Sequence, residues 1–217
     1  MLPERFSTPR GQRQRGTTLV EVLVTSALLL AIMLMLYTFA ASSERVYATE
    51  SDITSAKASG RAVIDVMSAE LRAAGYSPLG ASFDAIVAGD ALGLRLLADL
   101  DGDAIVGTET EPGENLSYRF EDPEADGVFE LIRGRDYNGD GDFDDTDESA
   151  AVVATHLVPI DADQDGVAEP FLVYDAEPPD TRLVTITFGA RTAHTNRVTG
   201  EYEITRFQTA VLLRNRR

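Results

Sequence analysis

One uncharged apolar segment constrains the fold of this chain more than any other feature: from Val22 to Ala41 no residue carries a charge. At about 1.5 Å per residue, a helix of this length can span the hydrocarbon core of a bilayer. A carboxylate, Glu21, stands directly at the entrance of the segment. A charge in this place costs on the order of a few kcal/mol in lipid, so it marks a candidate functional residue whose partner has to be identified.

The residues before Glu21 form a short basic leader that ends in Gly16, and Glu21 is the fifth residue after that glycine. Together with the apolar segment they resemble the cleavage and methylation signal of type IV prepilins and pseudopilins. The resemblance implies that a membrane peptidase cuts between Gly16 and Thr17 on the cytoplasmic side and methylates the new amino terminus. The sequence departs from the family at Thr17, where an apolar residue such as Phe is usual.

An ordinary secretory signal or an uncleaved anchor is the alternative interpretation of this segment. A secretory signal is cut after its apolar core at a site of small residues, which residues 40–43 imitate. A charge-rich leader ending in glycine and a carboxylate at the edge of the core fit that alternative poorly. The sequence therefore favours the prepilin signal.

The charge balance separates the leader from the rest of the chain. Without its four Arg and one Glu, 15 basic and 35 acidic residues remain, a net charge of about −20. The basic end marks the cytoplasmic side by the positive-inside rule, so everything after the anchor is expected to be exported. The strong acidity argues against nucleic acid as a partner. The absence of cysteine excludes disulfides and thiolate chemistry.

The apolar segment is expected to begin a much longer helix. Residues 44–74 contain no proline and keep apolar residues at helical spacing, which predicts one helix from about Leu19 to Ala74, roughly 80 Å long. Residues 75–78, Gly-Tyr-Ser-Pro, then supply the stop. Gly60 predicts a bend or fraying inside the helix, because glycine costs up to about 1 kcal/mol relative to alanine.

After Pro78 the pattern changes to short apolar runs separated by Gly, Asp and Pro, which is typical of strands joined by loops. The last two runs predict an antiparallel hairpin. The predicted strands are Leu92–Leu97, Leu116–Phe120, Val128–Ile132, Phe171–Tyr174, Leu183–Phe188 and Tyr202–Leu213.

Two segments extend the resemblance to PilW-type minor pilins: residues 69–76 resemble the end of their long helix, and residues 209–215 resemble their final strand. The fold class implied is α+β and type IV pilin-like. It comprises a long N-terminal helix, transmembrane in its first half, packed on a C-terminal antiparallel β-sheet domain with acidic loops. The expected divisions are a cleaved leader (1–16), a transmembrane or fibre-core helix (17–41), its amphipathic continuation (42–75) and a globular β-rich domain (76–217).

The acidic loops suggest a bound cation. Residues 136–147 place oxygen side chains at the first, third, fifth, seventh and ninth positions and a glycine at the sixth. Calcium takes six to eight oxygen ligands, and alternate residues of a tight loop can supply them, so the pattern predicts a structural calcium ion on an EF-hand-like loop. The predicted ligands are Asp136, Asn138, Asp140, Asp142, Asp144 and Asp147.

Similar but shorter patterns occur in three other segments. Asp161, Asp163 and Asp165 form a candidate second calcium site, while residues 99–103 and 122–127 repeat the theme more weakly. Aspartate and glycine also populate ordinary turns, because Asp accepts hydrogen bonds from nearby backbone and Gly adopts positive φ. For all three segments the plain turn is the favoured interpretation.

Catalytic templates are missing from the sequence. It contains no G-x-S-x-G elbow, P-loop, H-E-x-x-H or dinucleotide fingerprint, and its two histidines, His156 and His194, lack metal-like spacing. We therefore expect no enzymatic activity and no cofactor besides calcium.

The resemblance implies a minor pilin or pseudopilin that takes part in assembly or initiation of a type IV pilus-like filament. Glu21 would then pair with the methylated amine of Thr17. The implied partners are other pilin or pseudopilin subunits, the prepilin peptidase and the inner-membrane assembly machinery. The chain would cross the bacterial inner membrane once, with a periplasmic C-terminal domain, before it enters a pilus or periplasmic pseudopilus.

Two alternatives stay open. One is a pseudopilin of a type II secretion or DNA-uptake machine. The other is a membrane-anchored calcium-binding module or adhesin that never polymerises.

Overall fold

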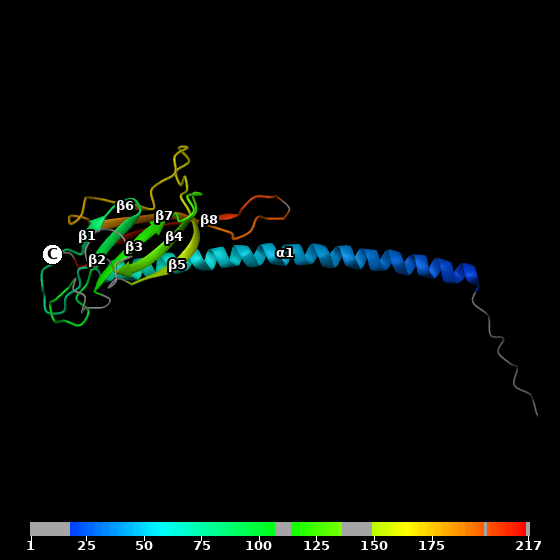
Figure 1. The fold of residues 1–217 in the computed structure, drawn as a ribbon, viewed down its shortest axis with the longest axis horizontal. Coiled ribbons are helices and arrows are strands. Elements are labelled where there is room, and N and C mark those ends of the chain that lie inside the picture. The colour runs from blue at the N-terminus through cyan, green and yellow to red at the C-terminus, as the bar shows by residue number, and fades with distance from the viewer. Residues whose placement is uncertain (1–17, 107–113, 136–148, 198, 216–217) are drawn as a thin grey trace, which may run out of the picture. The chain divides into compact units, whose positions relative to one another are not determined.

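The structure is a computed structural model that describes residues 18–106, 114–135, 149–197 and 199–215. It has an α+β, type IV pilin-like architecture: a long N-terminal helix with an apolar stretch is followed by an antiparallel β-sheet domain (Figure 1). This architecture confirms the predicted fold class. The chain divides into two compact units, residues 1–47 and residues 48–217.

Helix α1 (Leu19–Ala73) extends within one residue of the predicted boundary, and its last part contributes to the core of the second unit. One stripe of that part is buried, as expected for an amphipathic helix that covers a sheet. The buried positions recur mostly at spacings of three or four residues: Ala56, Gly60, Val63, Met67, Ser68 and Leu71.

Gly60 lies at a point of close approach. The chain stays helical through Gly60, so the predicted fraying is wrong. A Cβ atom added to Gly60 would lie only 2.2 Å from Cε2 of Phe207. The absence of a side chain at Gly60 therefore lets an aromatic ring from the sheet lie directly against the helix backbone.

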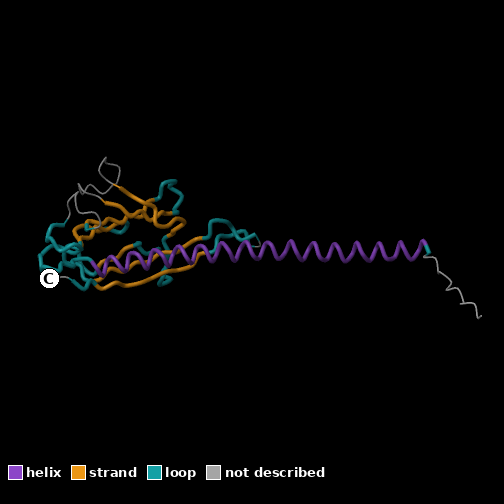
Figure 2. The backbone as a smooth tube through the Cα atoms, turned by 90° about the horizontal axis from the view of Figure 1, so that it is seen from below, coloured by secondary structure: helices purple, strands orange, loops and turns teal. Residues whose placement is uncertain are grey.

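The eight strands of the described residues form one sheet in which every pairing is antiparallel. Their order is β1-β2-β3-β4-β5-β7-β6, with β8 on β7. In Figure 2, strands run along both sides of the C-terminal part of α1. The strands are β1 (Ile86–Gly89), β2 (Gly93–Leu97), β3 (Asn115–Glu121), β4 (Phe129–Arg135), β5 (Ser149–Val158), β6 (Leu172–Tyr174), β7 (Leu183–Arg191) and β8 (Ile204–Leu212).

All six predicted strands are present with small shifts at their ends, and the predicted hairpin is confirmed. β7 and β8 pair continuously from Leu183 opposite Leu212 to Arg191 opposite Ile204. Two further strands, β1 and β5, were not predicted. The first residue of β5, Ser149, is followed by two alanines, which have low strand propensity, and the pairing of β5 with β4 is interrupted by register shifts.

The core lies between α1 and the sheet. Its largest fully buried side chains include Met67 and Leu71 of α1 and several aromatic residues of the strands. Phe120 and Phe171 stack with their ring centroids 4.3 Å apart. This packing holds the C-terminal part of α1 against the sheet. The acidic loop at residues 99–103 lies beside the helix exit, because the backbone N–H of Asp99 donates to the carbonyl of Tyr76 at 2.8 Å.

Candidate functional site

Glu21 lies in the first turn of α1, and its backbone takes part in capping the helix. The backbone N–H of Glu21 donates to the carbonyl of Thr18 at 3.0 Å and to its Oγ1 at 3.3 Å. Thr18 and Glu21 have the Ser/Thr-x-x-Glu spacing of a capping box, in which the threonine precedes the helix and the glutamate is its third residue. Glu21 thus has a local structural role available to it besides the predicted pairing with an amine.

The apolar part of α1 is exposed along its whole length: every described residue from 18 to 40 is exposed. This part of α1 is long and apolar enough to cross a membrane. Its serine and threonine hydroxyl groups donate to carbonyls of the same helix, those of Thr25 and Ser26 at 2.7 Å and that of Thr38 at 2.9 Å. Such internal satisfaction is what a helix needs in an environment without water.

The proposed cleavage and methylation positions, Gly16 and Thr17, lie outside the described residues. The same holds for all six predicted calcium ligands between Asp136 and Asp147. Of the predicted processing and assembly residues, the structure therefore describes only Glu21. Of the candidate metal sites, it describes only the shorter acidic loops.

The candidate second calcium site brings together a slightly different set of residues from the predicted one. Asp161, Asp163 and Glu169 each offer an oxygen atom within 4.8 Å of the others, whereas Asp165 is not in the group. One carboxylate oxygen of Asp165 instead accepts the backbone N–H of Val167 at 2.8 Å. The sequence signal for Glu169 was weak, because it lies outside the Asp-x-Asp-x-Asp repeat.

The loop at residues 99–103 also gathers carboxylates. Asp99, Asp101 and Asp103 are joined by Glu114, which stands at the start of β3 and which the sequence did not single out. In contrast, the loop at residues 122–127 is an ordinary turn, in which the Asp122 carboxylate accepts backbone N–H groups of Asp126 and Gly127.

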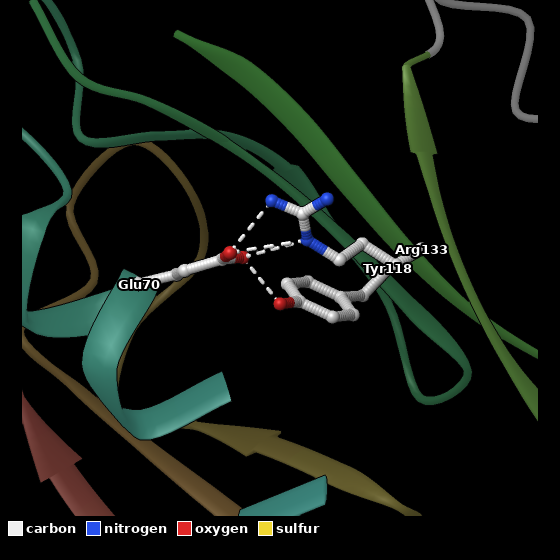
Figure 3. Close-up of polar contacts among 3 residues, drawn as sticks. All are labelled: Glu70, Tyr118 and Arg133. Carbon is white, nitrogen blue, oxygen red and sulfur yellow. Dashed lines mark hydrogen bonds and ion pairs between the residues drawn. The ribbon is translucent and has the colours of Figure 1, made fainter. Parts of the chain in front are cut away.

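A polar cluster joins α1 to the middle of the sheet (Figure 3). Arg133 of β4 donates to the Glu70 carboxylate from Nη2 at 2.7 Å and from Nε at 3.0 and 3.3 Å. The Tyr118 hydroxyl of β3 donates to Oε2 of the same carboxylate, from the side opposite Arg133 in Figure 3. Burial, reinforced by this bond to Glu70, raises the pKa of Tyr118 well above its usual value, and the bond to Glu70 raises the pKa of Arg133.

The two histidines have ordinary surroundings. His156 Nδ1 lies 2.9 Å from Thr155 Oγ1, and His194 Nδ1 lies 3.3 Å from an Asp52 carboxylate oxygen at the surface of the second unit. Neither belongs to a group of potential metal ligands in the described parts of the chain.

The fold and the exposed apolar helix define the class, an α+β protein of type IV pilin-like architecture. Residues 11–37 match the family model of the prokaryotic N-terminal methylation motif, the type IV prepilin-like signal. This motif indicates a pilin- or pseudopilin-like protein with a structural role, processed by a prepilin peptidase, and with α1 it fits an inner-membrane anchor. No curated protein and no solved structure matches the chain significantly.

Proposed function

We propose that this chain is a minor pilin or pseudopilin subunit that takes part in the assembly or initiation of a type IV pilus-like filament. The observation that carries the proposal is the methylation motif at residues 11–37, which overlaps a helix whose residues 19–40 are exposed and largely apolar. An apolar surface of this size requires a covering, which lipid provides before assembly and the helices of other subunits provide within a fibre.

The proposed role of Glu21 is to pair with the methylated amine of Thr17, either its own or that of a neighbouring subunit. Such a pair removes two unpaired charges from an apolar environment and sets the axial register of one helix against another. Its formation depends on cleavage after Gly16, because only cleavage creates the amine. Leader removal and assembly are therefore two steps of one proposed mechanism.

Glu21→Gln separates this pairing from helix capping. A glutamine keeps the spacing and hydrogen-bonding capacity of a capping box but carries no charge, whereas Glu21→Ala removes both. We expect both variants to be cleaved as in the wild type and both to be missing from sheared filaments, as measured by immunoblots of filament and membrane fractions. If Glu21→Gln subunits enter filaments normally, the charge-pairing mechanism is wrong.

Mass spectrometry of the purified protein tests the processing step. We expect loss of residues 1–16 and a methylated Thr17, and we expect Gly16→Val to retain the leader. A mature-sized protein in the Gly16→Val variant would contradict the proposed cleavage site. An unprocessed wild-type protein would favour the alternative of a membrane-anchored calcium-binding module or adhesin that does not polymerise.

The finer assignment to PilW-type minor pilins rests on the two segments at residues 69–76 and 209–215. These two segments contact each other, since Nδ2 of Asn215 donates to the carbonyl of Arg72 at 3.1 Å, a contact that any pilin-like fold of this kind could share. A pseudopilin of a type II secretion or DNA-uptake machine is the alternative within the class. Deletion of the gene, followed by assays of surface filaments, secretion and DNA uptake, distinguishes these assignments.

Structural calcium at Asp136–Asp147 and at the Asp161 loop stays a proposal. In the latter loop, Asp161 and Glu169 supply carboxylates beside Asp163. Calcium would stabilise the folded domain by binding it in preference to the unfolded chain.

A further inference from the structure

Four carboxylates converge where β2 leads into the loop before β3. Asp99, Asp101, Asp103 and Glu114 each offer one oxygen, and these four oxygens all lie within 4.8 Å of one another. Asp101 and Asp103 are exposed, whereas Asp99 and Glu114 are 0% and 3% exposed. The group therefore has a buried floor and an open side.

The two buried carboxylates form no ion pair with a basic side chain in the described part of the chain. Asp99 has hydrogen-bond donors for both oxygens, the backbone N–H of Gly102 and the hydroxyl of Ser77, each at 2.7 Å. Glu114 Oε1 accepts the backbone N–H groups of Leu100 and Asp101. Neutral donors of this kind do not neutralise the charge of two adjacent buried carboxylates.

Glu114 Oε2 provides an independent indication of a ligand. This oxygen is buried and has no hydrogen-bond partner. Its sister oxygen is held by the loop's own N–H groups, so the carboxylate lies against the loop that carries the three aspartates. A buried carboxylate oxygen without a partner is a rare arrangement that calls for a bound species to satisfy it.

We propose that Asp99, Asp101, Asp103 and Glu114 bind one calcium ion. Calcium lies about 2.3–2.6 Å from each of its oxygen ligands, so two oxygens that share an ion lie at most about 5 Å apart, in agreement with the observed grouping. The donors are all hard carboxylate oxygens, which do not select zinc or copper. Magnesium requires shorter, strictly octahedral contacts and retains its waters, so a multi-carboxylate loop suits calcium better.

The bound ion would fix the turn that follows α1 to the sheet. The backbone N–H of Asp99 donates to the carbonyl of Tyr76 at 2.8 Å, and Ser77 bonds to the Asp99 side chain. Glu114 lies at the entry to β3. One ion would therefore join the helix exit, the end of β2 and the start of β3, and it would do so whether or not the chain enters a filament.

The group at Asp161, Asp163 and Glu169 offers a matched control. Both oxygens of Asp161 and both oxygens of Glu169 accept backbone N–H groups. Glu169 is only half-buried and belongs to the other candidate calcium loop, so a glutamine there removes an acidic side chain of the same kind without changing the group at Asp99 and Glu114.

The test is calorimetric titration of the detergent-solubilised full chain, treated with chelator and dialysed, with calcium chloride. We expect saturable binding in the wild type. Glu114→Gln should weaken the affinity of one site at least tenfold or remove it from the stoichiometry, and Glu169→Gln should leave that site within about twofold. Unchanged affinity and stoichiometry in Glu114→Gln, or no binding by the wild type at millimolar calcium, would overturn the proposal.

Thermal melting of the same samples separates ion binding from a loss of fold. Glu114→Gln keeps the shape of the side chain and removes one repelling charge, so without calcium its melting temperature should equal or exceed that of the wild type. Calcium should then raise the wild-type melting temperature more than that of the variant. An equal rise in both proteins contradicts the site. If Glu114→Gln does not fold, Asp103→Asn at the exposed end of the loop must show the same loss of calcium response.

Magnesium at equal concentration tests the choice of ion. We expect at least tenfold weaker binding of magnesium than of calcium at the site that Glu114→Gln removes. Equal or tighter binding of magnesium would overturn the assignment to calcium.

Discussion

Removal of Arg133 from the polar cluster tests how α1 is held against the sheet. In Arg133→Met the long apolar stem is retained, and the three N–H contacts to Glu70 are lost. Hydrogen bonds to charged groups contribute about 1.5–3 kcal/mol, whereas exposed ion pairs contribute at most about 1 kcal/mol. The side chains of Arg133 and Glu70 are 37% and 22% exposed, between these two limits.

We therefore expect Arg133→Met to lower the free energy of unfolding by about 1.5–2 kcal/mol. For a domain of this size, the change corresponds to a fall in melting temperature of roughly 3–8 °C. Because the chain contains no tryptophan, unfolding of the detergent-solubilised protein in urea is best followed by near-ultraviolet circular dichroism of its tyrosines.

Arg119→Met is the matched control for this experiment. Arg119 on β3 lies 3.6 Å from Glu121 in an ion pair whose side chains are 43% and 39% exposed. The same substitution there should change stability by no more than about 0.5 kcal/mol. The double variant Arg133→Met with Glu70→Gln should lose less than the sum of the two single variants. Equal effects of Arg133→Met and Arg119→Met would refute the assignment of a stabilising role to the cluster.

Three further predictions follow from the packing around α1. Burial raises the folded-state pKa of Tyr118 and Tyr174, so the contribution of these two side chains to stability is complete below about pH 10 and is lost at higher pH. In an alkaline absorbance titration both tyrosines should ionise only when the domain unfolds, and replacement of either by phenylalanine should remove one tyrosine from that late phase. Gly60→Leu should destabilise the domain by about 1–3 kcal/mol despite the better helix propensity of leucine, because the Cβ atom of the leucine would overlap the Phe207 ring. A melting temperature at or above that of the wild type would contradict this packing. Asn215→Ala should lower the free energy of unfolding in urea by about 1 kcal/mol and speed amide exchange in the last turn of α1, because Nδ2 of Asn215 caps that turn. Unchanged exchange in the variant would show that the cap is unimportant.

The elements that could be predicted from sequence are those with a strong local pattern. The helix from Leu19 to Ala73 and the hairpin of β7 and β8 were predicted because their apolar residues repeat with the period of the element. β5 was missed because its first residues are exposed and alanine-rich and because His156 adopts a positive φ of 59°, which breaks the alternation expected of a strand.

The residues that complete the acidic clusters could not be found from local spacing alone. Asp99, Asp101 and Asp103 are visible as an alternating series, but Glu114 joins the group only because β2 and β3 pair antiparallel, which brings the end of one strand beside the start of the other. Glu70 and Arg133 are likewise 63 positions apart and meet only through the packing of α1 on the sheet. Contacts of this kind depend on strand order and register, which a single sequence specifies weakly.

The pairing of β8 has a consequence for biogenesis. β8 follows every other described strand in the chain, yet it supplies Val211 to the core and the Phe207 ring that lies on Gly60. A chain synthesised only as far as β7 lacks these contacts and exposes the side of β7 that pairs with β8, a template for unwanted strand pairing. The domain therefore completes its fold only after β8 has been synthesised and has paired with β7, so a chain that stops before β8 cannot present a finished surface to a partner.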